Sequence, residues 1–199
     1  MRITDDRYAN EQARFELALR LIRHQARTHI ITHCTGFTQD RVRKLYSTYF
    51  KHRNGRKVKR HRGKSPSNIE FFIRNPLRQA EATVLAHVFA IWDLLRILPD
   101  LATAPATAAD QLGFGQRFCD AYEEFHAAHP ATAITFEHAW SLLDALTQRD
   151  ELLLLDCVQC STFYVQDALA LDGRRCPACR LSARRRPLPG ADDACASRI

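Results

Sequence analysis

PLRQAEATVLAHVFAIWDLLRIL, residues 76–98, is the most apolar segment of this 199-residue chain. Pro76 suits the first turn of a helix, because the N–H group that proline lacks is not needed for hydrogen bonding there. Charged side chains interrupt the segment, which is therefore too polar to span a bilayer; they are Arg78, Glu81, Asp93 and Arg96. We predict a buried core helix that runs from Pro76 to about Leu98.

Helical spacing of apolar residues recurs on both sides of this segment, in the ranges 8–33, 110–128 and 135–149. Thr35-Gly36-Phe37 breaks the first of these patterns, and Thr38 is a suitable cap for the helix that follows. Residues 99–109 are rich in Pro and Ala, and we interpret them as a linker.

The pattern changes after residue 150. Leu152–Leu155 and Thr162–Gln166 have the composition of strands, and the Arg- and Pro-rich tail from Arg180 onward is expected to be loose. The predicted fold is mainly α, a helical bundle with an N-terminal helix-turn-helix-like unit and a small C-terminal four-cysteine zinc-binding region. We divide the chain into a helical domain (1–150), a zinc-binding region (151–186) and a flexible tail (187–199).

Four cysteines form two closely spaced pairs, CVQC at residues 157–160 and CPAC at residues 176–179. A two-residue gap lets both thiolates of one pair point at the same ion, and the fifteen residues between the pairs allow the chain to return. The ligands of one structural zinc ion would be Cys157, Cys160, Cys176 and Cys179. Four thiolates fill a tetrahedral shell and leave no position for a catalytic water.

An alternative is that the two pairs cycle between dithiol and disulfide, although single pairs do so more often than matched pairs. The three remaining cysteines have no partner at metal spacing. We expect Cys34 and Cys119 to be small core residues, and we assign no role to Cys195 in the tail.

Positive charge is concentrated at the N-terminal end of the chain. Residues 1–64 hold 17 Lys+Arg against 5 Asp+Glu, whereas residues 65–150 hold 5 against 11. A basic third beside an acidic middle indicates that one end of the protein meets a polyanion, and that the middle is available for a protein partner.

Residues 28–47 fit the helix-turn-helix pattern when Gly36 is placed at the turn. Val42 and Leu45 then lie on the buried face of the second helix. Its outward face carries Gln39, Asp40, Arg41, Arg43 and Lys44, of which Gln and Arg can read base edges and Arg and Lys can hold phosphates. The alternative is an ordinary helical hairpin with a solvated basic face.

A basic loop, KHRNGRKVKRHRGK at residues 51–64, follows this second helix directly. It contains eight Lys+Arg and no acidic residue, so it can neutralise phosphates and release counterions. We add these residues to the candidate DNA contacts: Lys51, Arg53, Arg56, Lys57, Lys59, Arg60, Arg62 and Lys64. A second cluster, from Arg174 to Arg186, surrounds the last cysteines and is either a DNA contact or simply solvated.

The chain resembles the FlhC family, the C subunits of the bacterial flagellar master transcriptional regulator. The resemblance covers about residues 8–186 and rests on features that occur in the same order. They are GFTQDRVRKLY (36–46), RGKSP (62–66), the helical region 71–98, the helix at 136–140 and the cysteine quartet. Lys51–Arg60 looks like an insertion, and Ser67–Glu70 replaces a Pro-Gly-rich connection of the family.

This resemblance implies a cytoplasmic, mainly helical protein that forms a hetero-oligomer with an FlhD-type partner. Together the two subunits would bind double-stranded DNA upstream of flagellar operons and activate transcription with RNA polymerase. The cysteine quartet would hold the zinc ion. We predict a transcriptional activator subunit and not an enzyme, since no histidine is paired with carboxylates in a metal motif.

Three other interpretations stay open at this stage: a diverged paralogue that regulates non-flagellar genes, a zinc-stabilised protein-interaction adaptor without a DNA role, and an enzyme that acts on nucleic acid. The adaptor leaves the basic N-terminal third unexplained. The N-terminal residues show no apolar signal core and no segment is a convincing membrane span, so we expect a cytoplasmic protein with reduced thiols.

Overall fold

A computed structural model of the chain describes residues 2–50, 58, 61, 68–98, 103–105, 110–148, 151–170 and 174–184. The basic loop (51–64), except for positions 58 and 61, and the predicted tail (187–199) lie outside the described residues. The described part is mainly helical, as predicted. None of its helices is both long and apolar enough to cross a membrane.

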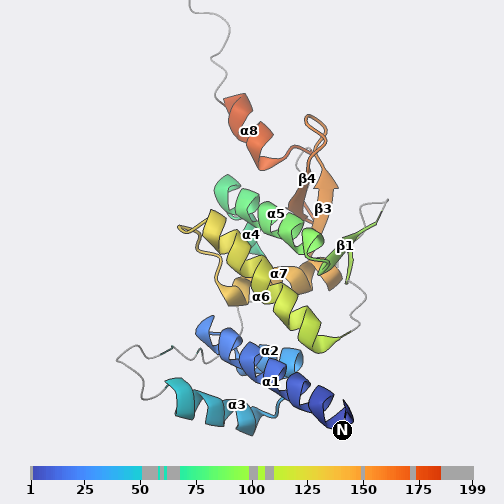
Figure 1. Cartoon of the computed structure of the whole chain (residues 1–199). Helices are drawn as coiled ribbons and strands as arrows, with labels where there is room; N and C mark the ends of the chain where they lie inside the picture. The colour runs from blue at the N-terminus through green and yellow to red at the C-terminus, as the bar shows by residue number, and fades with distance from the viewer. Residues whose placement is uncertain are drawn as a thin grey trace, which may run out of the picture.

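The helices and strands follow one another as α1 (Arg2–Arg23), α2 (Thr28–Thr35), α3 (Gln39–Leu45), a π-helical turn η1 (Tyr46–Phe50), α4 (Glu70–Ile73), α5 (Pro76–Ile91), β1 (Leu95–Ile97), β2 (Thr103–Pro105), α6 (Gln111–Ala128), α7 (Phe136–Gln148), β3 (Leu152–Asp156), β4 (Phe163–Asp167) and α8 (Pro177–Arg184). In Figure 1, α1 to α3 form one end of the molecule, α5, α6 and α7 form its middle, and β3, β4 and α8 form the other end.

The middle of the molecule is held together by aromatic side chains around Phe118 of α6, which is fully buried. Its ring centroid lies 5.7 Å from that of Phe89 on α5, 5.0 Å from that of Phe136 and 5.1 Å from that of Trp140, both on α7. Each such pair adds about 0.5–1.5 kcal/mol beyond simple burial. The sequence placed α6 and α7 correctly, because their apolar residues recur on one face.

Gly115 lets α6 approach α1 and α2 closely. A Cβ atom at this position would lie 2.7 Å from the Cβ of Cys34 and 2.8 Å from a methyl carbon of Leu17. Both of these neighbours are buried. Cys34 and Cys119 are core residues, as predicted, and burial raises the pKa of each thiol to about 12.

Side-chain caps mark the starts of several helices. The Thr38 side chain accepts a hydrogen bond from the backbone N–H of Arg41 at 3.3 Å, which confirms the predicted cap of α3. Asn75 caps α5 in the same way at 2.8 Å, and Asp110 caps α6 through two bonds of 3.1 Å. Gly36 adopts φ 69°, and its N–H closes α2 on the carbonyl of Thr32 at 2.9 Å.

The predicted helix over 8–33 is wrong as a single element, because it divides into α1 and α2. Gln25 adopts the left-handed conformation at φ 60°, and the N–H of Ala26 bonds the carbonyl of Leu21 at 3.0 Å. This arrangement ends α1 and buries Ala26. No glycine marks the break, so local propensity gave no sign of it.

The predicted core helix is also shorter than expected, since α5 ends at Ile91 and not near Leu98. Asp93 takes φ 51°, and the N–H of Leu94 bonds the carbonyl of Phe89 at 2.8 Å. Residues 95–97 then pair with residues 103–105 in an antiparallel ladder, so part of the predicted linker is a strand. Thr103 supports it by donating to the carbonyl of Leu146 at 2.5 Å.

The C-terminal tail, which we expected to be loose from Arg180 onward, is helical as far as Arg184. Residues 177–184 form α8, which begins at Pro177. The helix packs on α5, and the guanidinium of Arg180 donates a hydrogen bond to the side-chain carbonyl of Gln79. Arg180 therefore belongs to a helix that packs on α5, in which Leu181 remains 44% exposed.

Candidate metal centre and nucleic-acid surface

The cysteine quartet is assembled by a β-hairpin and the start of a helix. Cys157 directly follows β3, and a tight turn brings Cys160 back before β4. The turn closes through the bond from the N–H of Ser161 to the carbonyl of Cys157 at 2.8 Å, with Ser161 at φ 57°. Cys176 directly precedes α8, and Cys179 lies in its first turn. Each pair thus occupies a bend of the backbone, as the two-residue gap predicted.

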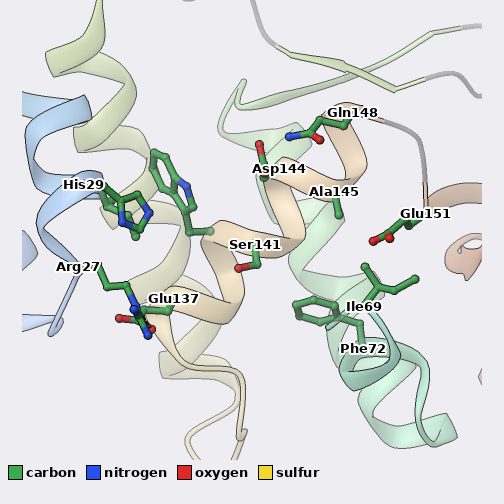
Figure 2. Close-up of a pocket in the computed structure, with 12 residues that line it drawn as sticks. Arg27, His29, Ile69, Phe72, Glu137, Ser141, Asp144, Ala145, Gln148 and Glu151 are labelled. Atoms are coloured by element: carbon green, nitrogen blue, oxygen red, sulfur yellow. Dashed lines mark ion pairs between the residues drawn. The ribbon is translucent and has the colours of Figure 1, made fainter. Parts of the chain in front are cut away.

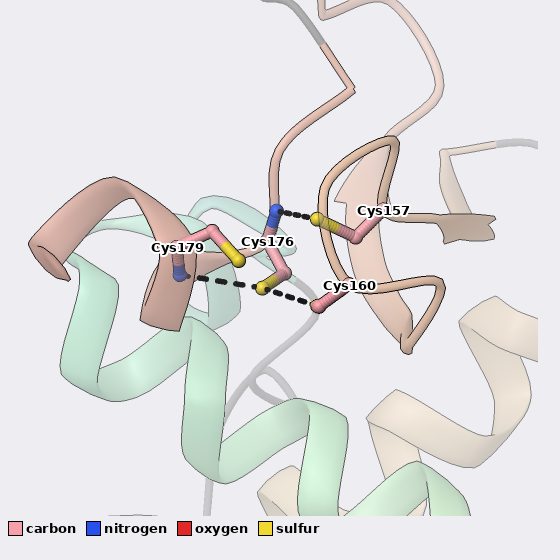
Figure 3. A group of neighbouring side chains, drawn as sticks. All are labelled: Cys157, Cys160, Cys176 and Cys179. Carbon is pink, nitrogen blue, oxygen red and sulfur yellow. Dashed lines mark hydrogen bonds between the residues drawn. The ribbon is translucent and has the colours of Figure 1, made fainter. Parts of the chain in front are cut away.

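The four sulfur atoms all lie within 4.8 Å of one another, and they could hold one metal ion. The Sγ atoms of Cys160 and Cys176 are 3.6 Å apart, and a dashed line in Figure 3 joins the two residues. Thiolates bound tetrahedrally to one zinc ion at about 2.3 Å stand about 3.8 Å apart, so the donor set fits zinc in number, type and spacing. None of the four forms a disulfide within the described residues.

Backbone donors support a charged sulfur cluster. The N–H of Cys176 donates to the Sγ of Cys157 at 3.2 Å, and the N–H of Cys179 donates to the Sγ of Cys176 at 3.4 Å (Figure 3). The first of these bonds is the main cause that lowers the pKa of Cys157 to about 6. Hydrogen bonding to neighbouring thiols raises the pKa of Cys179 to about 12. The Cys179 thiol therefore ionises less readily than a free cysteine, and a bound cation would favour its thiolate.

Burial differs among the four cysteines: Cys157 and Cys176 are buried, Cys179 is half-buried, and Cys160 is exposed. The ring of Tyr164 packs with the two buried ones in a small cluster of its own. All four donor positions belong to this chain, so a bound ion would have no open position for substrate. The arrangement is suited to a structural role.

The hairpin is anchored to α5 by two polar side chains that sequence reasoning missed. The amide nitrogen of Gln79 donates to the carbonyl of Val165 at 2.8 Å and to the side-chain oxygen of Gln166 at 2.5 Å. The hydroxyl of Thr83 accepts from the N–H of Val165 at 3.1 Å. Through these bonds, α5 provides hydrogen-bonding partners for both the backbone N–H and the backbone carbonyl of Val165. The spacing of Gln79 and Thr83, one helical turn apart in an apolar segment, was the available signal.

The proposed DNA-reading residues lie at the opposite end of the molecule from the cysteines (Figure 1). Val42 and Leu45 are buried, as predicted. The other face of α3 is exposed and carries Gln39, Asp40, Arg41, Arg43 and Lys44. The structure thus brings Gln39, Arg41, Arg43 and Lys44 together on one surface. The eight basic residues predicted between 51 and 64 lie outside the described residues.

Arg41 is engaged within the protein itself. It forms an ion pair with Glu11 of α1, and its guanidinium carbon lies 3.9 Å from the centre of the Phe37 ring. Arg43 pairs with Asp40 one turn away at 2.7 Å, at the surface. Arg41 therefore links α3 to α1 at the surface, and as exposed pairs both ion pairs contribute little to stability. Arg43 has only a neighbour on its own helix as partner, which leaves that side chain available.

A pocket of about 350 Å³ lies along α7, between α2 and α4 (Figure 2). At its edge Arg27 pairs with Glu137 at 2.9 Å, and both side chains are largely buried. Arg27 precedes α2, and Glu137 lies in the first turn of α7, where a negative charge is favourable. This pair ties the N-terminal helices to the middle of the molecule.

Comparison of the chain with models of known protein families gives no match, and comparison with curated protein sequences gives none either. The resemblance to the FlhC family therefore rests on the residues quoted above.

Proposed function

We propose that this chain is the DNA-binding subunit of a transcriptional activator, stabilised by one zinc ion on Cys157, Cys160, Cys176 and Cys179. The exposed face of α3 carries this proposal. It joins α2 through a turn at Gly36 and presents Gln39, Arg43 and Lys44 to solvent, as a recognition helix requires. α2 and α3 would form the helix-turn-helix-like unit.

Charge distribution supports the same surface. The 17 Lys+Arg of residues 1–64 include those of α3 and of the basic stretch that directly follows it. In the proposed complex the basic stretch neutralises phosphates, and the side chains of α3 read base edges. By resemblance to the FlhC family, an FlhD-type subunit is the partner, flagellar operons are the targets, and RNA polymerase is recruited.

The proposed zinc ion is structural. The core around the cysteines is small, with Tyr164 packed beside Cys157 and Cys176, so coordination would supply folding free energy that this cluster lacks. The centre lies far from α3, and its part in the complex is to hold the hairpin and α8 on α5.

The test compares two single substitutions by fluorescence anisotropy on a flagellar promoter duplex and a scrambled duplex, with the FlhD-type partner present. Arg43→Ala removes a base-reading candidate, whereas Arg96→Ala removes an equal charge from an exposed position on β1. We expect Arg43→Ala to weaken promoter binding by about 1–3 kcal/mol, and scrambled binding by less. Arg96→Ala should leave both unchanged.

If Arg43→Ala weakened binding equally on both duplexes, α3 would contact only phosphates. If Arg43→Ala and Arg96→Ala bound both duplexes with the same affinity, α3 would not be part of the DNA-binding surface. In that case the zinc-stabilised adaptor would be the better account of the fold.

A further inference from the structure

The solvent-facing side of α5 is apolar. Leu77 is 69% exposed, Val84 is 38% exposed and Ile91 is 76% exposed. The three residues are spaced by seven, and seven residues fall about 20° short of two helical turns, so they form one nearly straight row. The opposite side of α5 carries the buried residues Ala82, Leu85, Ala86 and Phe89. We call the row of three residues the α5 stripe.

A helix that is apolar on all its faces is ordinarily buried on all of them. The sequence predicted a buried core helix at this position, and Ala82, Leu85, Ala86 and Phe89 are buried as that prediction requires. The α5 stripe is an additional apolar row, which is exposed. Scattered single apolar residues on a surface need no explanation, but an aligned row about 21 Å long on one rigid helix is typical of an interaction site.

The spacing of the stripe specifies what covers it. Leu77 and Ile91 lie at equal distances from Val84, seven residues on either side. Two such helices placed antiparallel therefore match Leu77 with the partner's Ile91, and Val84 with the partner's Val84. A two-fold interface requires this kind of self-complementarity, because the same surface patch serves both subunits.

Charges at the two ends of α5 fit the same arrangement. Arg74 is exposed just before the helix, and Asp93 is exposed just after it. Ion pairs that involve either of them are absent among the described residues. They lie ten residues before Val84 and nine residues after it, so antiparallel pairing brings the Arg74 end of one helix beside the Asp93 end of the other. Parallel pairing would instead set like charges together.

We propose that α5 is a homodimer interface, in which the α5 stripes of two copies of this chain pack antiparallel about a two-fold axis at Val84. The interface closes on itself, so the assembly stops at two chains. Three exposed apolar side chains per copy make a small contact, and we expect reversible, concentration-dependent association. The inference does not depend on DNA binding.

Sedimentation velocity of the full chain over a range of concentrations tests the interface. The unmodified protein should move from a 22.8 kDa species toward twice that mass as concentration rises. Val84→Glu puts two carboxylates at the two-fold axis and should leave only the single-chain mass. Tyr8→Glu is the matched control, since Tyr8 is 74% exposed on α1 and lies away from α5, and it should associate like the unmodified protein.

A charge exchange separates a second copy from any other occupant. Arg74→Asp and Asp93→Lys should each raise the dissociation constant of the dimer about tenfold, because each substitution repeats at both ends of a two-fold interface. The double variant Arg74→Asp/Asp93→Lys restores opposite charges, and its dissociation constant should return close to that of the unmodified protein. Asp93→Lys and the double variant both carry lysine at position 93, where the backbone is left-handed. Any strain from that conformation is therefore the same in both and cancels when their dissociation constants are compared.

A single-chain mass for the unmodified protein at all concentrations would overturn the proposal. Dimers that tolerate Val84→Glu, or a double variant that is as weak as the single ones, would overturn it as well. If the isolated chain stayed monomeric and Val84→Glu abolished binding of an FlhD-type partner, the stripe would be the binding site for that partner instead. Circular dichroism of each variant confirms that it is folded.

Discussion

Gln79 anchors the cysteine-bearing hairpin to the middle of the molecule. Its replacement by leucine should therefore lower the free energy of unfolding and weaken the attachment of the hairpin. Gln79 is 2% exposed, and its amide makes hydrogen bonds to Val165 at 2.8 Å and to Gln166 at 2.5 Å. Leucine keeps the volume of the side chain and removes its polar atoms. The substitution therefore leaves the acceptors on β4 and the donor of Arg180 without their partner.

The cost follows from these contacts. Each buried hydrogen bond contributes about 0.5–1.5 kcal/mol, and a polar group left without a partner costs about 1–3 kcal/mol. The loss of these three bonds from a buried site gives a decrease of about 2–4 kcal/mol in the free energy of unfolding. In a chain of 199 residues each kcal/mol lowers the melting temperature by about 2–4 °C, so we expect a fall of about 4–16 °C.

Thermal unfolding followed by circular dichroism measures this effect on the zinc-loaded protein. The matched control is Gln12→Leu, because Gln12 bonds Glu16 at 2.9 Å on the exposed side of α1. We expect the control to change the free energy of unfolding by less than about 0.5 kcal/mol. Gln79→Leu should also release zinc faster to a chelator. Equal melting temperatures for the two variants would refute the anchoring of the hairpin through Gln79.

Cys176→Ser should lose the zinc ion and destabilise the C-terminal region, and a variant that retains one full equivalent by elemental analysis would rule out the four-thiolate site. Gly115→Ala should cost about 1–3 kcal/mol in chemical denaturation, because its Cβ overlaps two buried neighbours; an unchanged midpoint would mean that α6 moves freely. Hydrogen bonds from Arg20 lower the pKa of Glu123 to about 2, so the stability that this carboxylate contributes is present above about pH 4.5 and is lost as the pH falls toward 2. Glu123→Gln should flatten that part of a stability–pH curve, and an identical acid profile would exclude the contribution.

Short-range signals were sufficient for much of this structure. The cap at Thr38, the turn at Gly36 and the position of the two cysteine pairs each depend on a few neighbouring residues. The helical spacing of apolar residues in α6 and in α7 likewise depends only on the buried face of each helix. These features could be read from the sequence because the physical cause lies within a single element.

The remaining features depend on contacts between distant parts of the chain. Gln25 and Asp93 adopt left-handed conformations that their residue types do not demand, and each helix ends there so that the next residue, Ala26 or Leu94, can be buried. Gln79 and Val165 meet although 86 residues separate them. Composition also could not distinguish a buried face of α5 from an exposed one, because both faces are apolar.

The claim that this protein recognises DNA is tested most directly by fluorescence anisotropy at physiological salt, with a flagellar promoter and a scrambled duplex, with and without the FlhD-type partner. We predict tight binding that favours the promoter and appears or sharpens when the partner is present, since α3 would read bases while the basic stretch holds phosphates. Weak binding that is equal on both duplexes and disappears with salt, whether or not the partner is present, would contradict the account.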